Sequence, residues 1–201
     1  MSDNLRPAIT VSDFSESAAQ GHVNKLQEIS EAFSPDQPII VTIDSHGGSI
    51  YGLSLLYSYL ESQQHPIITY TASKAFSAGA ILLAAGASKS QNKSSPMRVA
   101  APNATIMIHE LQAGADFGDI KSLENAIDYF GFENDRWMGI LAKAMGRKTA
   151  SDVRKLLHTK AKNELYLTAR QALRLKLIDA VGYLRMSEPR TFCDPILHRE
   201  K

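Results

Sequence analysis

Residues 39–49 read IIVTIDSHGGS, and this stretch decides the fold. Its first part, IIVTI, is β-branched and almost wholly apolar, which is typical of a strand buried on both faces in a parallel sheet. The glycine pair then marks a tight turn, and apolar side chains follow over residues 53–60 at helical spacing. A buried strand, a glycine turn and a helix in this order predict one unit of an α/β protein.

The same pattern repeats on both sides of this stretch. Upstream, a short β-like run at 9–11 precedes a helical stripe over 17–33. Downstream, a second buried strand is predicted at 67–71, a small-residue helix at 78–87 and a further strand at 105–109. The resulting βαβαβ order predicts an α/β fold with right-handed crossovers.

The C-terminal half is predicted to be mainly helical. Residues 119–145 carry the longest helical stripe, with a disturbance expected at Gly131 and a C-terminal cap at Gly146. A short helix is predicted at 151–157, and the capping-box spacing of residues 168–171 predicts the start of a last helix.

The chain has no linker or repeat that would divide it, so residues 1–201 are predicted to form a single domain. Residues 1–8 and 188–201 are predicted to be loose tails. The Ser/Lys-rich segment 88–96 and the glycine-flanked segment 114–118 are predicted to be loops.

Composition excludes several classes of protein. Hydrophobic residues make up 44% and the net charge is +1, which points to a globular chain without a nucleic acid or an anionic membrane as partner. The lone cysteine, Cys193, forms no internal disulfide or zinc site, and we expect no metal or cofactor. The N-terminal residues contain no apolar signal core, and no apolar run is long enough to span a membrane, so a cytoplasmic location is expected.

Three strand ends carry residues that could do chemistry, and the first is the turn at Gly47-Gly48. Glycines let a backbone approach a ligand with free N–H groups, and such a turn can donate to a developing oxyanion. An ordinary tight turn explains the glycine pair equally well. Phosphate binding is disfavoured, because neither GxGxxG nor a Walker lysine is present.

The second strand end carries Ser77, at the start of the small-residue helix. A serine at such a junction can be a nucleophile, with the N–H of Ala78 serving an oxyanion. The alternative is a plain N-cap serine, with Ser73 as a competing cap. Lys74, close in sequence, leaves a Ser–Lys pair as a further possibility.

The third strand end carries His109, which could accept the proton of a serine. The alternative is a hydrogen-bonded structural histidine. Zinc is disfavoured, because His109-Glu110 does not continue into HExxH.

Taken in order, these segments resemble the proteolytic subunit of the Clp protease over about residues 9–184. Residues 43–49 (IDSHGGS) resemble that family's INSPGGS, with His46 in place of proline. Three further segments complete the resemblance: 75–86 to ASMGAxLLAAG, 102–109 to PNSRVMIH, and 166–169 with 177–179 to FMSA and GLID. The implied fold class is a ClpP/crotonase-like α/β fold of repeated βαβ units, in which the long helix is a handle.

The resemblance also implies roles for single residues. Ser77 matches the nucleophile, His109 the base, and Gly48 and Ala78 the backbone donors of the oxyanion hole. The family's triad aspartate falls at Glu164, with Asn163 beside it as the alternative. A carboxylate there would fix the imidazole tautomer, and glutamate fills this role in some hydrolases.

The resemblance implies a serine endopeptidase that acts on peptides or unfolded proteins, without a cofactor, in a ring of identical subunits. The expected ring is heptameric, and two rings could stack. The short segment before residue 9 argues against docking of an AAA+ unfoldase. The competing hypotheses are a catalytically weak or inactive ring subunit and a crotonase-type acyl-CoA enzyme.

Overall fold

The computed structural model describes residues 7–87, 98–112, 119–160 and 164–184. Within them, two sheets are covered by helices. The larger sheet is parallel throughout, with strand order β1-β2-β3-β5-β8. Its strands are β1 (Ala8–Val11), β2 (Ile39–Ile43), β3 (Ile67–Thr71), β5 (Arg98–Ala100) and β8 (Ala180–Val181).

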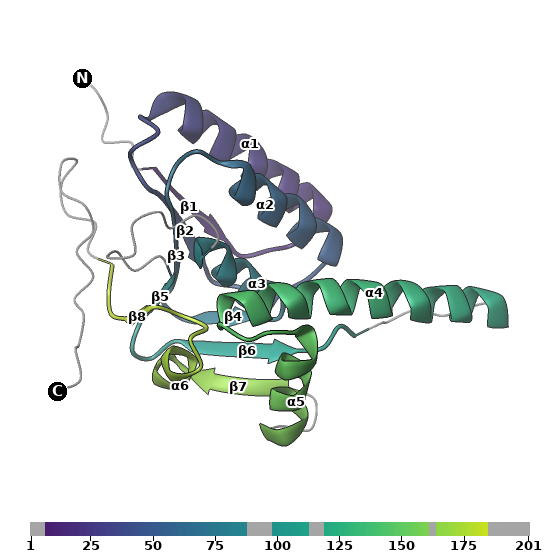
Figure 1. Cartoon of the computed structure of the whole chain (residues 1–201). Coiled ribbons are helices and arrows are strands. Elements are labelled where there is room, and N and C mark those ends of the chain that lie inside the picture. Colours follow the sequence, from purple (N-terminus) through teal and green to yellow (C-terminus); the bar gives the residue numbers. More distant parts are fainter. Residues whose placement is uncertain (1–6, 88–97, 113–118, 161–163, 185–201) are drawn as a thin grey trace.

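A smaller sheet lies beside the end of the larger one and has the order β4-β6-β7 (Figure 1). It consists of β4 (Lys74–Phe76), β6 (Thr105–His109) and β7 (Glu164–Thr168). Strand β4 runs parallel to β6, whereas β7 runs antiparallel to it. The short β3–β4 connection therefore carries the chain from one sheet to the other.

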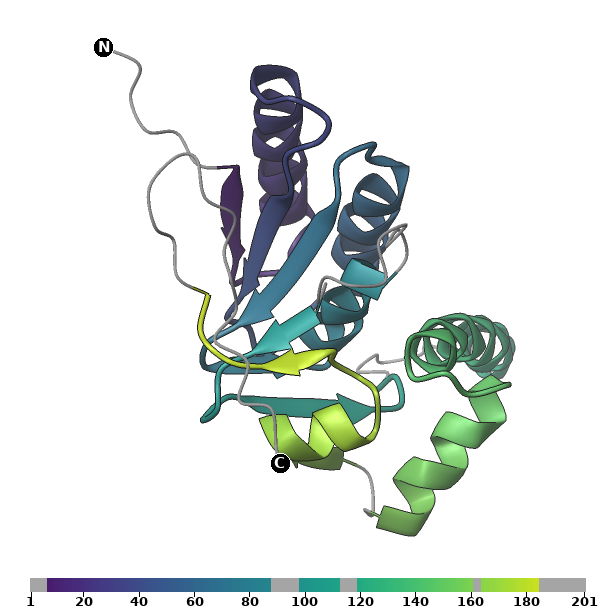
Figure 2. The same cartoon turned by 60° about the vertical axis from the view of Figure 1, so that its left-hand side comes forward.

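The helices fall into three groups. Helices α1 (Glu16–Ala32) and α2 (Ile50–Ser62) lie side by side along one face of the larger sheet (Figure 2). Helix α3 (Ala78–Leu83) continues into a 3₁₀ turn (Ala84–Ala87). The C-terminal helices are α4 (Ile120–Ala144), α5 (Ala150–Lys160) and α6 (Ala169–Arg174).

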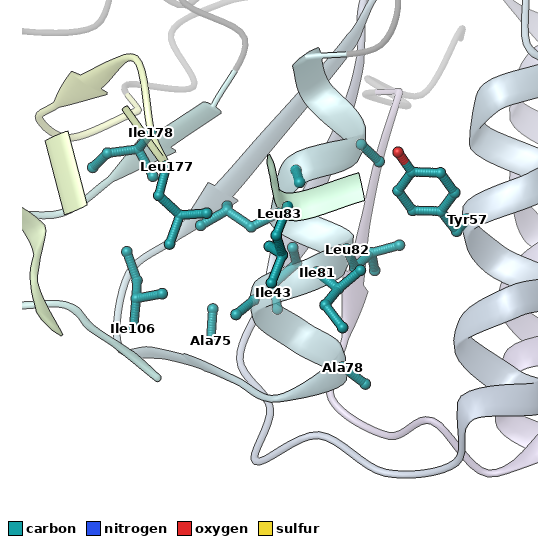
Figure 3. Packing of buried hydrophobic residues seen from close by; sticks show 14 of the residues in the cluster. Ile43, Tyr57, Ala75, Ala78, Ile81, Leu82, Leu83, Ile106, Leu177 and Ile178 are labelled. Atoms are coloured by element: carbon teal, nitrogen blue, oxygen red, sulfur yellow. The ribbon is translucent and has the colours of Figure 1, made fainter. Parts of the chain in front are cut away.

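Helix α3 is the centre of the core. All its residues are buried, and Ile81, Leu82 and Leu83 pack among apolar side chains from both sheets and from α2 (Figure 3). The small residues Ala78, Gly79 and Ala80 allow close approach; Gly79 lies so near β2 that an added Cβ would be 3.3 Å from Ile43 Cγ2. The apolar composition of residues 78–83 thus places the start of α3 against the strand ends.

Helix α4 projects from the body (Figure 1). Its C-terminal part is anchored by the buried Trp137, Met138 and Leu141, whereas Ile120 and Ile127 nearer its N-terminus are 77% and 61% exposed. The helix runs unbroken through Gly131, so the disturbance predicted there is absent. It does end as predicted, since Gly146 has a φ of 65° and donates to the Lys143 carbonyl.

The α/β fold and its long handle helix are confirmed, and the capping box of Thr168 and Gln171 is present. The short strands β4, β5, β7 and β8 were not predicted from the sequence: β4, β5 and β8 have only two or three residues, and β7 lacks the continuous apolar run by which β2 and β3 were recognised. Strand β1 already includes Ala8, so the N-terminal tail ends earlier than predicted. The predicted loops at 88–96 and 114–118 and the tail at 188–201 lie outside the described residues.

Candidate active site

Ser77 occupies the junction between β4 and α3 in an unusual backbone conformation. Its φ of 54° and ψ of −118° lie outside the regions that a serine normally adopts, and its side chain makes no capping hydrogen bond. Ser73 lies between β3 and β4 and caps no helix, so the competing cap assignment is wrong. A backbone held in a rare conformation costs free energy, and such residues cluster at functional sites.

Neighbouring strands hold the Ser77 backbone in place. The Ser77 N–H donates to the Met107 carbonyl on β6 at 2.9 Å, which brings Ser77 beside the strand that ends at His109. On the other side, the Phe76 N–H donates to the Ser45 carbonyl at 3.0 Å. The nucleophile candidate therefore lies between the glycine turn and the histidine strand.

The glycine turn packs directly on Ser77. A Cβ added to Gly47 would lie 2.7 Å from Ser77 Cβ and 3.0 Å from the Phe76 carbonyl oxygen, and its φ of 103° is unfavourable for other residues. The Ser45 hydroxyl accepts from the Gly47 N–H at 3.1 Å and fixes the turn. Only glycine satisfies both the conformation and the space at position 47.

The two predicted oxyanion donors have free N–H groups. Among the described residues, the N–H groups of Gly48 and Ala78 donate no hydrogen bond to the protein. Ala78 is the first residue of α3, where backbone donors lack partners within the helix (Figure 3). Both groups are therefore available to a ligand oxygen.

His109 is the last residue of β6 and is half-buried. Its Nδ1 contacts the backbone carbonyl of Glu110. Directly across the antiparallel β6–β7 pair stands Glu164. Side chains that face each other in such a pair lie on the same face of the sheet with Cβ atoms about 5 Å apart.

Glu164 is exposed at the start of β7, and Tyr166 holds its carboxylate. The Tyr166 hydroxyl donates to Glu164 Oε2 at 2.8 Å. This hydrogen bond to the carboxylate raises the pKa of the Tyr166 phenol. The structure thus brings Glu164 opposite His109, but the hydrogen bond of its carboxylate goes to Tyr166. Asn163 lies outside the described residues.

Tyr166 is also part of a row of rings that leads back to the glycine turn. Its ring packs edge-on against Phe76 with centroids 5.6 Å apart, and Phe76 packs against His46 at 5.5 Å. The row connects β7, β4 and the glycine turn. No role was predicted from the sequence for His46 or for the Tyr166 hydroxyl.

Glu110 connects the end of β6 to two helices, and no functional role was predicted for it from the sequence. Its carboxylate accepts from Asn134 Nδ2 of α4 at 2.7 Å and lies 3.0 Å from His158 Nε2 of α5. Arg154 Nε is 3.5 Å away. The residue after His109 is therefore anchored to the base of the handle helix.

Lys74 is engaged elsewhere. Its ammonium group lies 2.9 Å from the Asp44 carboxylate. The Lys74 side chain is thus directed to Asp44, which disfavours it as a base for Ser77. Within the described ranges, no cluster of His, Cys, Asp or Glu is suited to a metal ion, and no helix has the length and apolar character to cross a bilayer.

Comparison with known proteins shows the family. The model of the Clp protease family matches residues 6–185, and the chain belongs to this family. Similar curated proteins are ATP-dependent Clp protease proteolytic subunit 2 of Streptomyces coelicolor, subunit 1 of Rhodococcus jostii and subunit 4 of Streptomyces avermitilis, which are 30%, 30% and 31% identical over 151 residues. These alignments cover 75% of this chain but only 64%, 63% and 62% of the relatives.

Proposed function

We propose that this chain is a serine endopeptidase that cleaves peptides or unfolded polypeptides through an acyl-enzyme. The observation that carries the proposal is the backbone of Ser77, held at a φ of 54° against Gly47, with a hydroxyl that caps no helix and with the N–H groups of Gly48 and Ala78 unpaired among the described residues. A strained serine at a strand-to-helix junction is the arrangement of a nucleophile elbow.

In the proposed mechanism, His109 takes the Ser77 proton while Oγ attacks the peptide carbonyl carbon. The carbonyl oxygen becomes an oxyanion that accepts from the N–H groups of Gly48 and Ala78; loss of one such donor slows comparable enzymes by about 10²–10³-fold. His109 then gives its proton to the leaving amine, and the C–N bond breaks. Water, deprotonated by His109, hydrolyses the ester and releases the acid.

Glu164 is proposed as the third member of the triad. Its position opposite His109 in the β6–β7 register supports this role, because a carboxylate at that distance can accept from Nδ1. We expect Glu164→Gln to slow the reaction by orders of magnitude while the oligomer remains intact. An unchanged rate would transfer the role to Asn163 or to no side chain.

We further propose that the chain works as a ring of identical subunits, heptameric by family resemblance, which could stack in two rings. The exposed apolar residues near the N-terminal end of α4 support an assembly that covers them, because single chains seldom expose such a stripe. The relatives' names describe ATP-dependent protease subunits, which makes a Clp-type ATPase a candidate partner. Mass measurement by light scattering and a pull-down with such an ATPase test these two points.

A catalytically weak or inactive subunit is the second candidate. It is favoured by two contacts, that of His109 Nδ1 with the Glu110 carbonyl and that of Glu164 with Tyr166, since neither links the triad members. A crotonase-type enzyme is the third candidate, and CoA-thioester turnover that survives Ser77→Ala would favour it.

Labelling with a fluorophosphonate, which reacts with activated serines, tests the proposal without knowledge of the substrate. We expect the assembled chain to be labelled at Ser77, as located by peptide mass spectrometry, and the label to disappear in Ser77→Ala. His109→Ala should abolish labelling although the serine is present. An assembled parent chain that takes up no label would support the inactive subunit instead.

A further inference from the structure

Strand β7 brings a carboxylate and a phenol together on one face. Its burial alternates, so that Glu164 and Tyr166 are exposed on one side and Leu165 and Leu167 are buried on the other. The Tyr166 hydroxyl donates to Glu164 Oε2 at 2.8 Å. The bond joins residues two apart on a single strand, so its geometry does not depend on any other element.

The same face of β6 carries the residues opposite this pair. His109 stands opposite Glu164, and Met107 stands opposite Tyr166. The Tyr166 ring is further held by its edge-on contact with Phe76, the residue that precedes Ser77. The phenol is therefore a fixed donor beside the His109 position.

A glutamate needs such a donor more than an aspartate does. Its side chain has one more rotatable bond, and an exposed carboxylate loses more rotamer freedom when it is held in one place. A carboxylate has two oxygens, and the phenol donates to Oε2; no hydrogen bond to Oε1 is present among the described residues, so Oε1 can accept from an imidazole N–H.

We propose that Tyr166 is a positioning residue, which holds the Glu164 carboxylate by one oxygen so that the other faces His109. The inference rests on the proposed triad of Ser77, His109 and Glu164. Tyr166 takes no part in proton transfer, and it acts by limiting the positions of the Glu164 side chain. The raised pKa of the Tyr166 phenol is consistent with this contact.

The first test is the rate constant of fluorophosphonate labelling at Ser77 in Tyr166→Phe, which removes the hydroxyl but keeps the ring on Phe76. We expect a loss of about three- to tenfold, the range for one hydrogen bond. Tyr183→Phe is the matched control, because Tyr183 is 48% exposed against 52% for Tyr166 and lies beyond β8, outside the site. The control should label at the parent rate.

The second test separates positioning from a general effect of the hydroxyl. Aspartate at position 164 is too short to keep the same bond to the phenol, so Tyr166→Phe should change the Glu164→Asp background by less than about 1.5-fold. An equal loss in both backgrounds, or no loss in the parent, would overturn the inference. Rescue of Tyr166→Phe by Glu164→Asp, with recovery toward the parent rate, would support it.

A third readout follows the phenol itself. With tyrosines labelled at ¹³Cζ and the Tyr166 signal assigned from Tyr166→Phe, NMR titration should show a Tyr166 pKa that falls toward the ordinary value in Glu164→Gln. If the pKa of Tyr166 is the same in Glu164→Gln and in the parent, the bond is absent in solution. If the parent chain takes up no label at Ser77, the proposed function and this inference fall together; if the parent is labelled but Tyr166→Phe is indistinguishable from it, the inference falls alone.

Discussion

Gly47→Ala should lower both the stability of this protein and the reactivity of Ser77, its proposed nucleophile. The new methyl group would lie 2.7 Å from Ser77 Cβ, closer than real Cβ atoms come to another heavy atom, and 3.0 Å from the Phe76 carbonyl oxygen, which is also a tight contact. The φ of 103° adds backbone strain for alanine. Strain of about 1–3 kcal/mol and overpacking of about 1–3 kcal/mol predict a loss of about 2–6 kcal/mol in the free energy of unfolding.

The expected functional loss follows from the same contact. The turn should relieve the overlap by moving away from Ser77, and that movement would carry the Gly48 N–H out of its proposed oxyanion position. Loss of one donor corresponds to about a 10²–10³-fold lower rate. We therefore expect Ser77 to be labelled by a fluorophosphonate at least about 10²-fold more slowly than in the parent.

Urea unfolding at one fixed protein concentration measures the stability term, with Trp137, the chain's single tryptophan, as the fluorescent probe. Gly131→Ala is the matched control, because an added Cβ there meets nothing within 4 Å and the residue lies inside α4. The control should gain about 0.5–1 kcal/mol from helix propensity. If Gly47→Ala unfolds within about 0.5 kcal/mol of the parent and labels equally fast, the contact between the glycine turn and Ser77 is wrong.

Three further predictions concern the handle helix and the scaffold. Ile127→Glu should leave the chain folded, as judged by circular dichroism, but should shift the assembly toward smaller species in light scattering. An unchanged mass would show that α4 is not part of the assembly interface. Arg98→Met should lower the free energy of unfolding by about 1.5–3 kcal/mol, because it removes the buried guanidinium that donates two hydrogen bonds to the partly exposed Asp179 carboxylate; an unchanged free energy of unfolding in urea would contradict this. Hydrogen bonds from Ser122 hold the pKa of Asp119 below its ordinary value of 3.8, so the N-cap of α4 is intact at neutral pH and is lost as the pH falls through that lowered pKa. In an NMR titration, the chemical shift of the Ser122 amide should change over the same pH range. In Asp119→Asn this change with pH should be absent.

Strands β1, β2, β3 and β6 and the longer helices could be predicted because their sequences carry strong patterns. The run IIVTI is almost wholly apolar, as a strand covered on both faces requires, and the stripe of α4 persists over its whole length. The other two strands of the smaller sheet could not be predicted in this way. Strand β4 has only three residues, and β7 follows a helix from which its exposed Glu164 and Tyr166 do not distinguish it.

The candidate site was only partly predictable for a related reason. Ser77 and Gly48 lie at the ends of predicted elements, so their order in the chain was informative. The position of Glu164 opposite His109 depends on the register between β6 and β7, and no local sequence pattern predicts that register. The bond from Tyr166 to that carboxylate lies within β7, and it was not predicted because the resemblance at positions 166–169 concerned the aromatic ring and not its hydroxyl.

The register of β7 therefore matters more to the proposed triad than the handle helix does. A slip of one residue would place Leu165 opposite His109 and turn Glu164 to the other face. Two features oppose such a slip: Leu165 and Leu167 are buried, and Thr168 ends the strand by capping α6 with its own side chain. Because the cap of α6 fixes the last residue of β7, it also fixes which residue faces His109. Thr168→Ala weakens this cap and should therefore slow the labelling of Ser77, although Thr168 does not contact the reacting atoms. A normal labelling rate in a folded Thr168→Ala chain would show that the buried leucines alone set the register.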